Sequence, residues 1–170
     1  GKMWAHELYS IKPDIIAFGK KTQVCGMLAG DRIYKLENNV FKESSRINST
    51  FGGNLVDMYR FKLILEIIKK ENLLLNSEKM GTYLLDKLKN SALEFPGYLT
   101  NVRGRGLFCA FDLPSQLERN KLIDKALKNK MIILGSGDNS IRFRPHLNVS
   151  IDELDQSIDI IRICLKNMMN

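Results

Sequence analysis

A lysine follows a short apolar segment near the start of the chain. Residues 15–18 are all apolar, Gly19 interrupts the run, and Lys20 comes next. An apolar run bounded by turn residues predicts a short buried strand, and ligands bind at strand ends in α/β sheets. Burial there favours the neutral, nucleophilic form of a lysine amine. Such an amine can form a Schiff base with a carbonyl group.

This pattern leaves an alternative open, in which two solvated lysines, Lys20 and Lys21, simply close the strand. If one of the two lysines faces a bound ligand, the other points away from it, because neighbouring side chains of an extended chain point in opposite directions. The segment therefore indicates a candidate nucleophile and a rival beside it.

A second segment contains groups suited to an anion. Thr50 lies in the polar and glycine-rich stretch 48–54, which leads directly into a long helical pattern. Gly52 and Gly53 let the backbone approach a ligand closely, and the N-terminus of a helix favours negative charge. Without further information, the same stretch is also an ordinary turn before a helix.

A third candidate lies far downstream. Arg142 belongs to an apolar strand pattern that ends at Pro145. A guanidinium binds a carboxylate through two parallel hydrogen bonds, which suits it to an amino-acid substrate. Arg144 has the same side-chain parity on an extended strand, so chemistry does not separate the two arginines. A structural salt bridge at the strand end is the alternative.

In this order, the lysine, the threonine and the arginine resemble the class III family of pyridoxal-phosphate-dependent aminotransferases. Within the family, segments 18–26 and 46–50 look most similar to those of L-lysine 6-aminotransferases. The resemblance implies the cofactor pyridoxal 5'-phosphate and transfer of the terminal amino group of L-lysine to 2-oxoglutarate. The products would be glutamate and 2-aminoadipate 6-semialdehyde. The alternative within the family is another ω-aminotransferase, acting on ornithine, 4-aminobutyrate or diaminobutyrate.

The resemblance also implies roles for individual residues. Lys20 matches the family lysine that joins the cofactor as a Schiff base and later moves a proton. Thr50 matches the family threonine that binds the cofactor phosphate from the neighbouring subunit, so a homodimer with a shared active site is expected. Asn48 and Ser49 are weaker candidates for the same region. Arg142 matches the arginine that binds the substrate α-carboxylate.

One departure from the family pattern follows the arginine strand. The common family sequence there is Pro-Pro-Leu, whereas this chain has Pro145, His146 and Leu147. The local shape of the pocket is therefore expected to differ, while the assignment of Arg142 is unaffected.

The expected fold class is α/β. By resemblance, residues 1–75 form the end of the large domain of a fold-type I pyridoxal-phosphate-dependent transferase, and residues 76–170 form the small C-terminal α/β domain. Short buried strands are expected at 14–18 and 24–29. A largely buried helix is expected from Asn54, with Asp57 as a capping-box-like partner, to about residue 72.

The small domain is predicted from alternating periodicities. Its expected elements are a helix at 77–93, two strand segments within 98–113 around a glycine-rich bulge at 104–106, a helix from Ser115 to about 129, strands at 131–134 and 140–143 joined by a turn at 135–139, and a final helix capped by Ser150 and Glu153. Leu154, Ile158, Ile161 and Leu165 are the expected buried positions of that last helix.

Composition narrows the function classes. The 170 residues hold three cysteines, too few and too scattered for a disulfide or zinc framework. A metal site is not expected, and a reduced, cytoplasmic setting fits best. No apolar run approaches the roughly 18 residues of a membrane span. The net charge of +7 raises the alternative of a non-catalytic basic module for nucleic acid or a partner, but the dispersed lysines favour solvation and attraction of anionic substrates.

The chain begins Gly1-Lys2-Met3, with its first strand pattern already within the lysine motif. The sequence is therefore expected to be a piece of a longer protein, in which groups for the cofactor ring precede residue 1. We expect the piece alone to be inactive.

Overall fold

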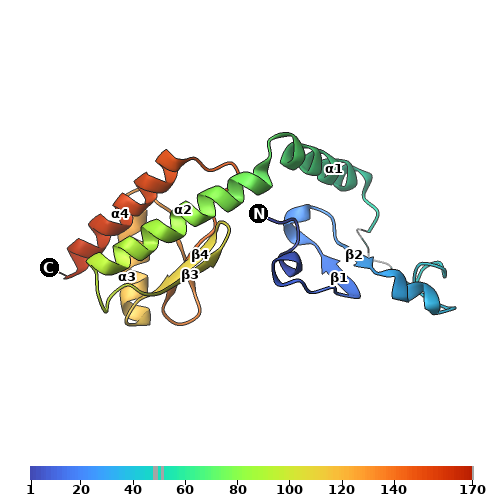
Figure 1. The fold of residues 1–170 in the computed structure, drawn as a ribbon, viewed down its shortest axis with the longest axis horizontal. Coiled ribbons are helices and arrows are strands. Elements are labelled where there is room, and N and C mark those ends of the chain that lie inside the picture. The colour runs from blue at the N-terminus through green and yellow to red at the C-terminus, as the bar shows by residue number, and fades with distance from the viewer. Residues whose placement is uncertain (48–49, 51, 170) are drawn as a thin grey trace. The chain divides into compact units, whose positions relative to one another are not determined.

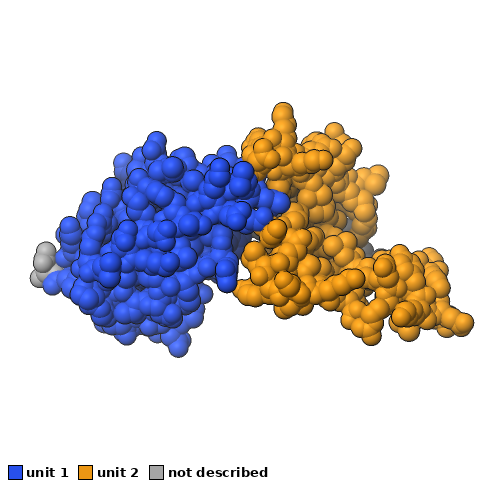
Figure 2. Space-filling view, in the orientation of Figure 1, with its two compact units in different colours: residues 1, 73–170 blue, residues 2–72 orange. Residues whose placement is uncertain are grey.

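The computed structural model describes residues 1–47, 50 and 52–169. The chain divides into two compact units. Unit 2 comprises residues 2–72, and unit 1 comprises Gly1 together with residues 73–170 (Figure 2).

The described part of unit 2 contains a β-hairpin, three 3-10 turns and one long helix (Figure 1). The turns are η1 (Ala5–Tyr9), η2 (Lys20–Thr22) and η3 (Asp31–Lys35), the strands are β1 (Ile15–Phe18) and β2 (Gly26–Ala29), and the helix is α1 (Leu55–Lys70). The two strands pair antiparallel, from Ile15 opposite Ala29 to Phe18 opposite Gly26. The ring of Phe18 lies 6.1 Å from those of Trp4 and Phe61, which joins the hairpin to α1.

The N-terminus of α1 forms as its sequence predicts. The side chain of Asn54 accepts hydrogen bonds from the backbone of Val56 at 3.0 Å and Asp57 at 3.5 Å, which satisfies donors that would otherwise lack a partner. The carboxylate of Asp57 instead binds Arg60 at 3.0 Å. Asp57 therefore adds charge in the first turn rather than the expected capping-box contact.

The prediction that α1 is largely buried is wrong for this chain. None of its residues is buried, and Leu55 is 79% exposed. The other strongly exposed apolar residues of the helix are Val56, Met58, Tyr59, Leu63, Leu65 and Ile67. These side chains lie on several sides of the helix, and the described part of unit 2 is too small to cover them.

Unit 1 contains a four-stranded antiparallel sheet with three helices. Its elements are α2 (Leu73–Glu94), β3 (Thr100–Arg105), β4 (Phe108–Asp112), α3 (Gln116–Lys128), β5 (Leu134–Ser136), β6 (Ser140–Phe143) and α4 (Ile151–Met169). The strand order is β3-β4-β6-β5. The helix α4 packs against both α2 and α3 (Figure 1).

The predicted elements of unit 1 are present, with three shifts. The helix expected at 77–93 already begins at Leu73. The strand expected at 131–134 begins only at Leu134. The expected bulge at 104–106 is instead the end of β3 followed by a two-residue turn, because Arg105 lies opposite Phe108. Gly106 has a φ of 50° in this turn, a left-handed conformation that glycine adopts without steric cost.

The core of unit 1 lies between the helices and one face of the sheet. Cys109, Phe111 and Ile141 point into it, and the rings of Phe111 and Phe143 lie 6.0 Å apart. The predicted core positions of α4 are confirmed, since Leu154, Ile158, Ile161 and Leu165 are all buried. No described helix is long and apolar enough to cross a membrane.

Both predicted caps in unit 1 are confirmed. The Ser115 hydroxyl accepts a hydrogen bond from the backbone of Glu118 at 3.3 Å. The Ser150 hydroxyl accepts one from the backbone of Glu153, also at 3.3 Å, while the Glu153 carboxylate accepts from the backbone of Ser150 at 2.8 Å. Reciprocal bonds of this kind fix the start of a helix and hence the loop that enters it.

Candidate active site

Lys20 begins the turn η2, directly beyond the end of β1. Its φ of 62° places the backbone in the left-handed region, which is uncommon for a residue with a side chain and is concentrated at functional sites. The backbone N–H of Gln23 donates to the Lys20 carbonyl at 3.2 Å and closes the turn. The turn ends the strand and sets the direction in which the lysine leaves it.

The Lys20 side chain is exposed in this chain, whereas the sequence predicted that it would be buried. The reason is local. The segment folds as a two-stranded hairpin in which Ile15 remains 56% exposed, instead of as strands buried within a larger sheet. The predicted place at a strand end is therefore observed, and the predicted burial is not.

A hollow of about 620 Å³ lies in unit 2 between residues that follow Lys20 and residues on both sides of Thr50, although neither Lys20 nor Thr50 lines it. One wall is formed by residues 23–27, which follow Lys20, and the other by Ile47, residues 52–54 and Asp57. Arg60 bridges the two by donating to Gln23 at 3.3 Å. Thr50 itself is exposed, while Asn48 and Ser49 lie outside the described residues.

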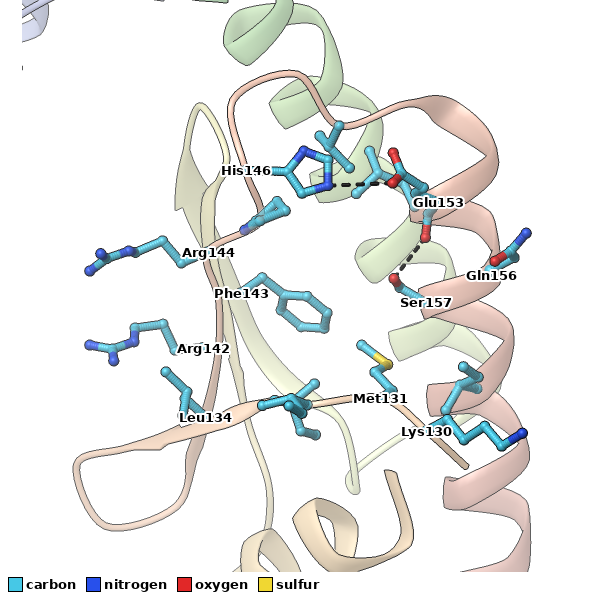
Figure 3. A pocket seen from close by; sticks show the side chains of 16 residues that line it. Lys130, Met131, Leu134, Arg142, Phe143, Arg144, His146, Glu153, Gln156 and Ser157 are labelled. Atoms are coloured by element: carbon cyan, nitrogen blue, oxygen red, sulfur yellow. Dashed lines mark hydrogen bonds and ion pairs between the residues drawn. The ribbon is translucent and has the colours of Figure 1, made fainter. Parts of the chain in front are cut away.

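Arg142 lies on β6 in unit 1, between Ala110 of β4 and Leu134 of β5. It is half-buried, and its Nε atom is buried without a hydrogen-bond partner in the described part of the chain. Figure 3 shows Arg142 and Arg144 extending to the same side of the strand, opposite Phe143. The predicted parity of the two arginines is thus confirmed, with both on the sheet face that the helices leave open.

A second hollow, of about 710 Å³, lies on the Phe143 side between residues 130–134, β6 and α4. His146, which stands where the resemblance led us to expect a proline, lies at this hollow (Figure 3). Its Nδ1 lies 2.9 Å from Asn148 Oδ1 and its Nε2 lies 3.4 Å from a carboxylate oxygen of Glu153. The departure from Pro-Pro-Leu therefore attaches the loop after Arg144 to the cap of α4.

A polar network on the open sheet face surrounds Asp112. Its carboxylate accepts from Arg103 at 2.8 Å and from Asn101 at 2.6 Å, and it also binds the Ser140 hydroxyl. Burial opposes ionisation of this carboxyl, but the hydrogen bonds from Ser140, Asn101 and Arg103 outweigh it and keep the pKa of Asp112 below its ordinary value. The positive charge of Arg103 is therefore balanced by a carboxylate within unit 1.

The sequence patterns did not identify Asn76, which binds the loop between β6 and α4. The side-chain amide of Asn76, on α2, donates to the carbonyls of Leu147 at 2.7 Å and Val149 at 3.2 Å. No local pattern connects residues so far apart in the chain. Among the residues that the structure describes, no group of three His, Cys, Asp or Glu side chains gathers as a metal site.

The mixed α/β fold is that of the fold-type I pyridoxal-phosphate-dependent transferases. The chain superposes with a TM-score of 0.93 on the lysine aminotransferase from Mycobacterium tuberculosis in the internal aldimine form, at 45% identity. The match covers 96% of this chain and 38% of that one.

The Aminotransferase class-III family matches residues 1–165, and the chain belongs to this family. It is 46% identical over 165 residues to the L-lysine-epsilon aminotransferase of M. tuberculosis and 45% identical over 166 residues to that of Amycolatopsis lactamdurans. Each match covers 97% of this chain, which spans 37% of the length of each relative. The family and the fold class indicated by the sequence are confirmed.

Proposed function

We propose that the whole protein is an L-lysine 6-aminotransferase that uses pyridoxal 5'-phosphate and transfers the terminal amino group of lysine to 2-oxoglutarate. The observation that carries the proposal is the 46% identity to a lysine-epsilon aminotransferase over 97% of this chain. The products are glutamate and 2-aminoadipate 6-semialdehyde. Because the chain spans little more than a third of such relatives, the activity belongs to the whole protein.

The donor groups of the chain suit this cofactor. An accessible amine at Lys20 matches an aldehyde, and the exposed hydroxyl of Thr50 matches a phosphate. Residues that follow Lys20 and residues on both sides of Thr50 line one hollow in unit 2. When bound, pyridoxal 5'-phosphate supplies an aldehyde that captures amines and a ring that withdraws electrons from the substrate.

Lys20 performs two tasks in this proposal. Its amine would hold the cofactor covalently, and as a free amine it would move a proton at the reacting carbon of the substrate. The position of Lys20 supports this role, because the residue lies in a left-handed turn directly beyond the end of β1 and its side chain is exposed. Lys21, one residue on, is the rival.

Thr50 binds the cofactor phosphate, with Asn48 and Ser49 as weaker candidates in the same region. We propose that this contact is made across a homodimer interface. The exposed apolar residues of α1, which begins five residues after Thr50, support the assignment. A helix that is apolar on several sides is normally covered in the assembled protein.

Arg142 binds the substrate carboxylate. Its guanidinium is anchored on a paired strand, and its buried Nε lacks a partner in the described part of unit 1. A carboxylate would supply the missing acceptor.

Unit 2 then forms the end of the large cofactor-binding domain, and unit 1 forms the small domain, with the boundary near residue 75. The division of the structure after Asn72 supports this organisation. The free cysteines Cys25, Cys109 and Cys164 support a reduced, cytoplasmic location.

The test uses the full-length protein. Lys20→Ala is expected to abolish lysine-dependent transamination and the borohydride-trapped pyridoxyl label, which mass spectrometry locates on the Lys20 peptide in the parent enzyme. Lys21→Ala is the matched control, and it should keep both. A label that moves with Lys21 instead would refute the assignment, and the absence of any cofactor absorbance would refute the function.

A further inference from the structure

The loop between β6 and α4 contains a histidine whose two ring nitrogens both face oxygen atoms. The Nδ1 atom of His146 lies 2.9 Å from Asn148 Oδ1, and its Nε2 atom lies 3.4 Å from Glu153 Oε1. A carboxylate oxygen and an amide oxygen accept hydrogen bonds and donate none. Both ring nitrogens of His146 must therefore donate if the two contacts are to form together.

The protonation state of His146 decides whether it can donate twice. A neutral imidazole has one N–H group and one nitrogen that accepts, whereas the imidazolium ion has two N–H donors. Loss of the proton therefore leaves one of the two oxygen atoms facing a lone pair of the ring. Histidine side chains change charge between about pH 5 and pH 8, so the pair of contacts depends on pH within this range.

The carboxylate of Glu153 stays ionised over the same range. Its Oε2 atom accepts hydrogen bonds from the backbone N–H and from the hydroxyl of Ser150, both at 2.8 Å, while its Oε1 atom faces His146. The backbone bond, the hydroxyl bond and the charge of His146, in that order, keep the pKa of Glu153 below its ordinary value. One carboxylate therefore joins the cap of α4 to the histidine.

The other charged groups that line this hollow are cations, and Figure 3 shows them away from the imidazole. Arg142 and Arg144 extend to the opposite side of the strand, and Lys130 lies at the other end of the hollow. Asn76, which contacts the loop from α2, is neutral. The carboxylate of Glu153 is therefore the charge that acts on the imidazole most directly.

We propose that His146 is a pH-dependent positioning residue, which in its protonated form fixes the loop 145–149 to the start of α4. When the histidine is neutral, the loop keeps the contacts of Asn76 with Leu147 and Val149, so deprotonation loosens the loop without releasing it. A proline in place of His146 would have no side-chain donor for either contact. This inference does not depend on the proposed function, because it concerns the order of a loop and not a reaction.

The experiment measures backbone hydrogen exchange of the full-length protein at about pH 5.5 and about pH 8, each rate divided by the intrinsic rate at that pH. The amide of Val149 donates to the His146 carbonyl at 3.2 Å and that of Ser150 donates to Glu153, so a peptide with both amides reports on the loop. Their protection should be about 2- to 5-fold greater at the lower pH, as expected for an exposed ion pair. His146→Gln should remove this difference by lowering the protection at the lower pH.

Two further variants separate the charge of the histidine from other contacts of the loop. Rotation of the Asn148 amide would offer its NH2 group to a neutral ring, whereas a carboxylate accepts in either orientation. Asn148→Asp should therefore keep or widen the pH difference. Asn76→Ala should lower the protection by a similar factor at both pH values, because the amide of Asn76 does not titrate.

His6→Gln is the matched control. His6 belongs to unit 2, where its Nδ1 atom lies 2.9 Å from the carbonyl oxygen of Ile11, and its substitution should leave the loop unchanged. Equal protection of the parent protein at both pH values would overturn the proposal. A pH difference that persists in His146→Gln, or one that disappears in His6→Gln, would also overturn it.

Discussion

The two units differ sharply in the burial of their apolar side chains. In unit 1, Leu84, Phe111, Leu122 and Ile161 are fully buried between the sheet and its helices. In the described part of unit 2, no apolar side chain is buried. The closest approach to a core there is the contact of Phe18 with Trp4 and Phe61.

The difference separates two kinds of stability. Unit 1 removes apolar surface from water within itself, at roughly 25 cal/mol for each Å². Unit 2 contains a two-stranded hairpin, which is marginally stable without further packing. The proposed carboxylate-binding residue Arg142 therefore belongs to a unit with its own core, whereas the proposed cofactor-binding residues Lys20 and Thr50 belong to a unit without one.

The largest expected effect comes from separating the units. Residues 73–170 expressed alone should unfold cooperatively, with an unfolding free energy on the order of 5–15 kcal/mol. Residues 2–72 alone should show no cooperative transition, because they bury too little apolar surface to offset chain entropy. Urea titration followed by circular dichroism measures both. A cooperative transition in residues 2–72 would break the comparison.

A smaller effect is expected from one methyl group in unit 1. Gly81 of α2 is buried, and a Cβ there would overlap the backbone carbonyl group of Gly106 in the β3–β4 turn. Gly81→Ala should therefore destabilise unit 1 by about 1–3 kcal/mol, as measured by the denaturant midpoint. The neighbouring Thr82 is exposed, so Thr82→Ala should change stability by less than about 0.5 kcal/mol. Equal effects of the two substitutions would show that α2 does not pack closely on the turn.

The smallest effect concerns pH. The pKa of Asp112 is lower in the folded state than its ordinary value, so the folded state binds fewer protons at this carboxyl than the unfolded state does. Its contribution is complete above the ordinary carboxyl pKa of about 3.9 and is lost as the pH falls toward the lower folded value.

Asp112→Asn should accordingly remove part of the acid sensitivity of unit 1 below about pH 4. Denaturant midpoints measured at several pH values detect the change. The control is Asp138→Asn, in the exposed turn between β5 and β6, which should leave the pH profile unchanged. An unaltered profile in Asp112→Asn would show that the network on the open face does not stabilise the ionised carboxylate.

Much of unit 1 could be predicted because its signals are local. The four-residue and three-residue spacings of α4 place Leu154, Ile158 and Ile161 on one side, and that side is buried. The Ser150 and Glu153 cap is readable at three-residue spacing. The parity of Arg142 and Arg144 follows from the strand period of two.

The errors arise where burial depends on partners. The apolar residues of α1 satisfy a helical period, which predicts the helix but not what covers it. The sequence places Lys20 correctly at a strand end. The burial of its side chain depends on how many strands flank β1, and the sequence pattern does not predict that number. The Asn76 clamp on Leu147 and Val149 joins elements that no local spacing relates. Sequence patterns thus predict the apolar faces of helices and the ends of strands better than they predict which elements pack against each other.

The order of the units along the chain has a consequence for biosynthesis. Ribosomes add residues from the amino end, so the uncovered leucines and aromatic rings of unit 2 emerge before the self-sufficient unit has been translated. At bacterial or eukaryotic speeds, translation of residues 73–170 takes on the order of ten seconds. During that interval, chaperones and neighbouring polypeptides can bind the exposed apolar surface of the nascent segment.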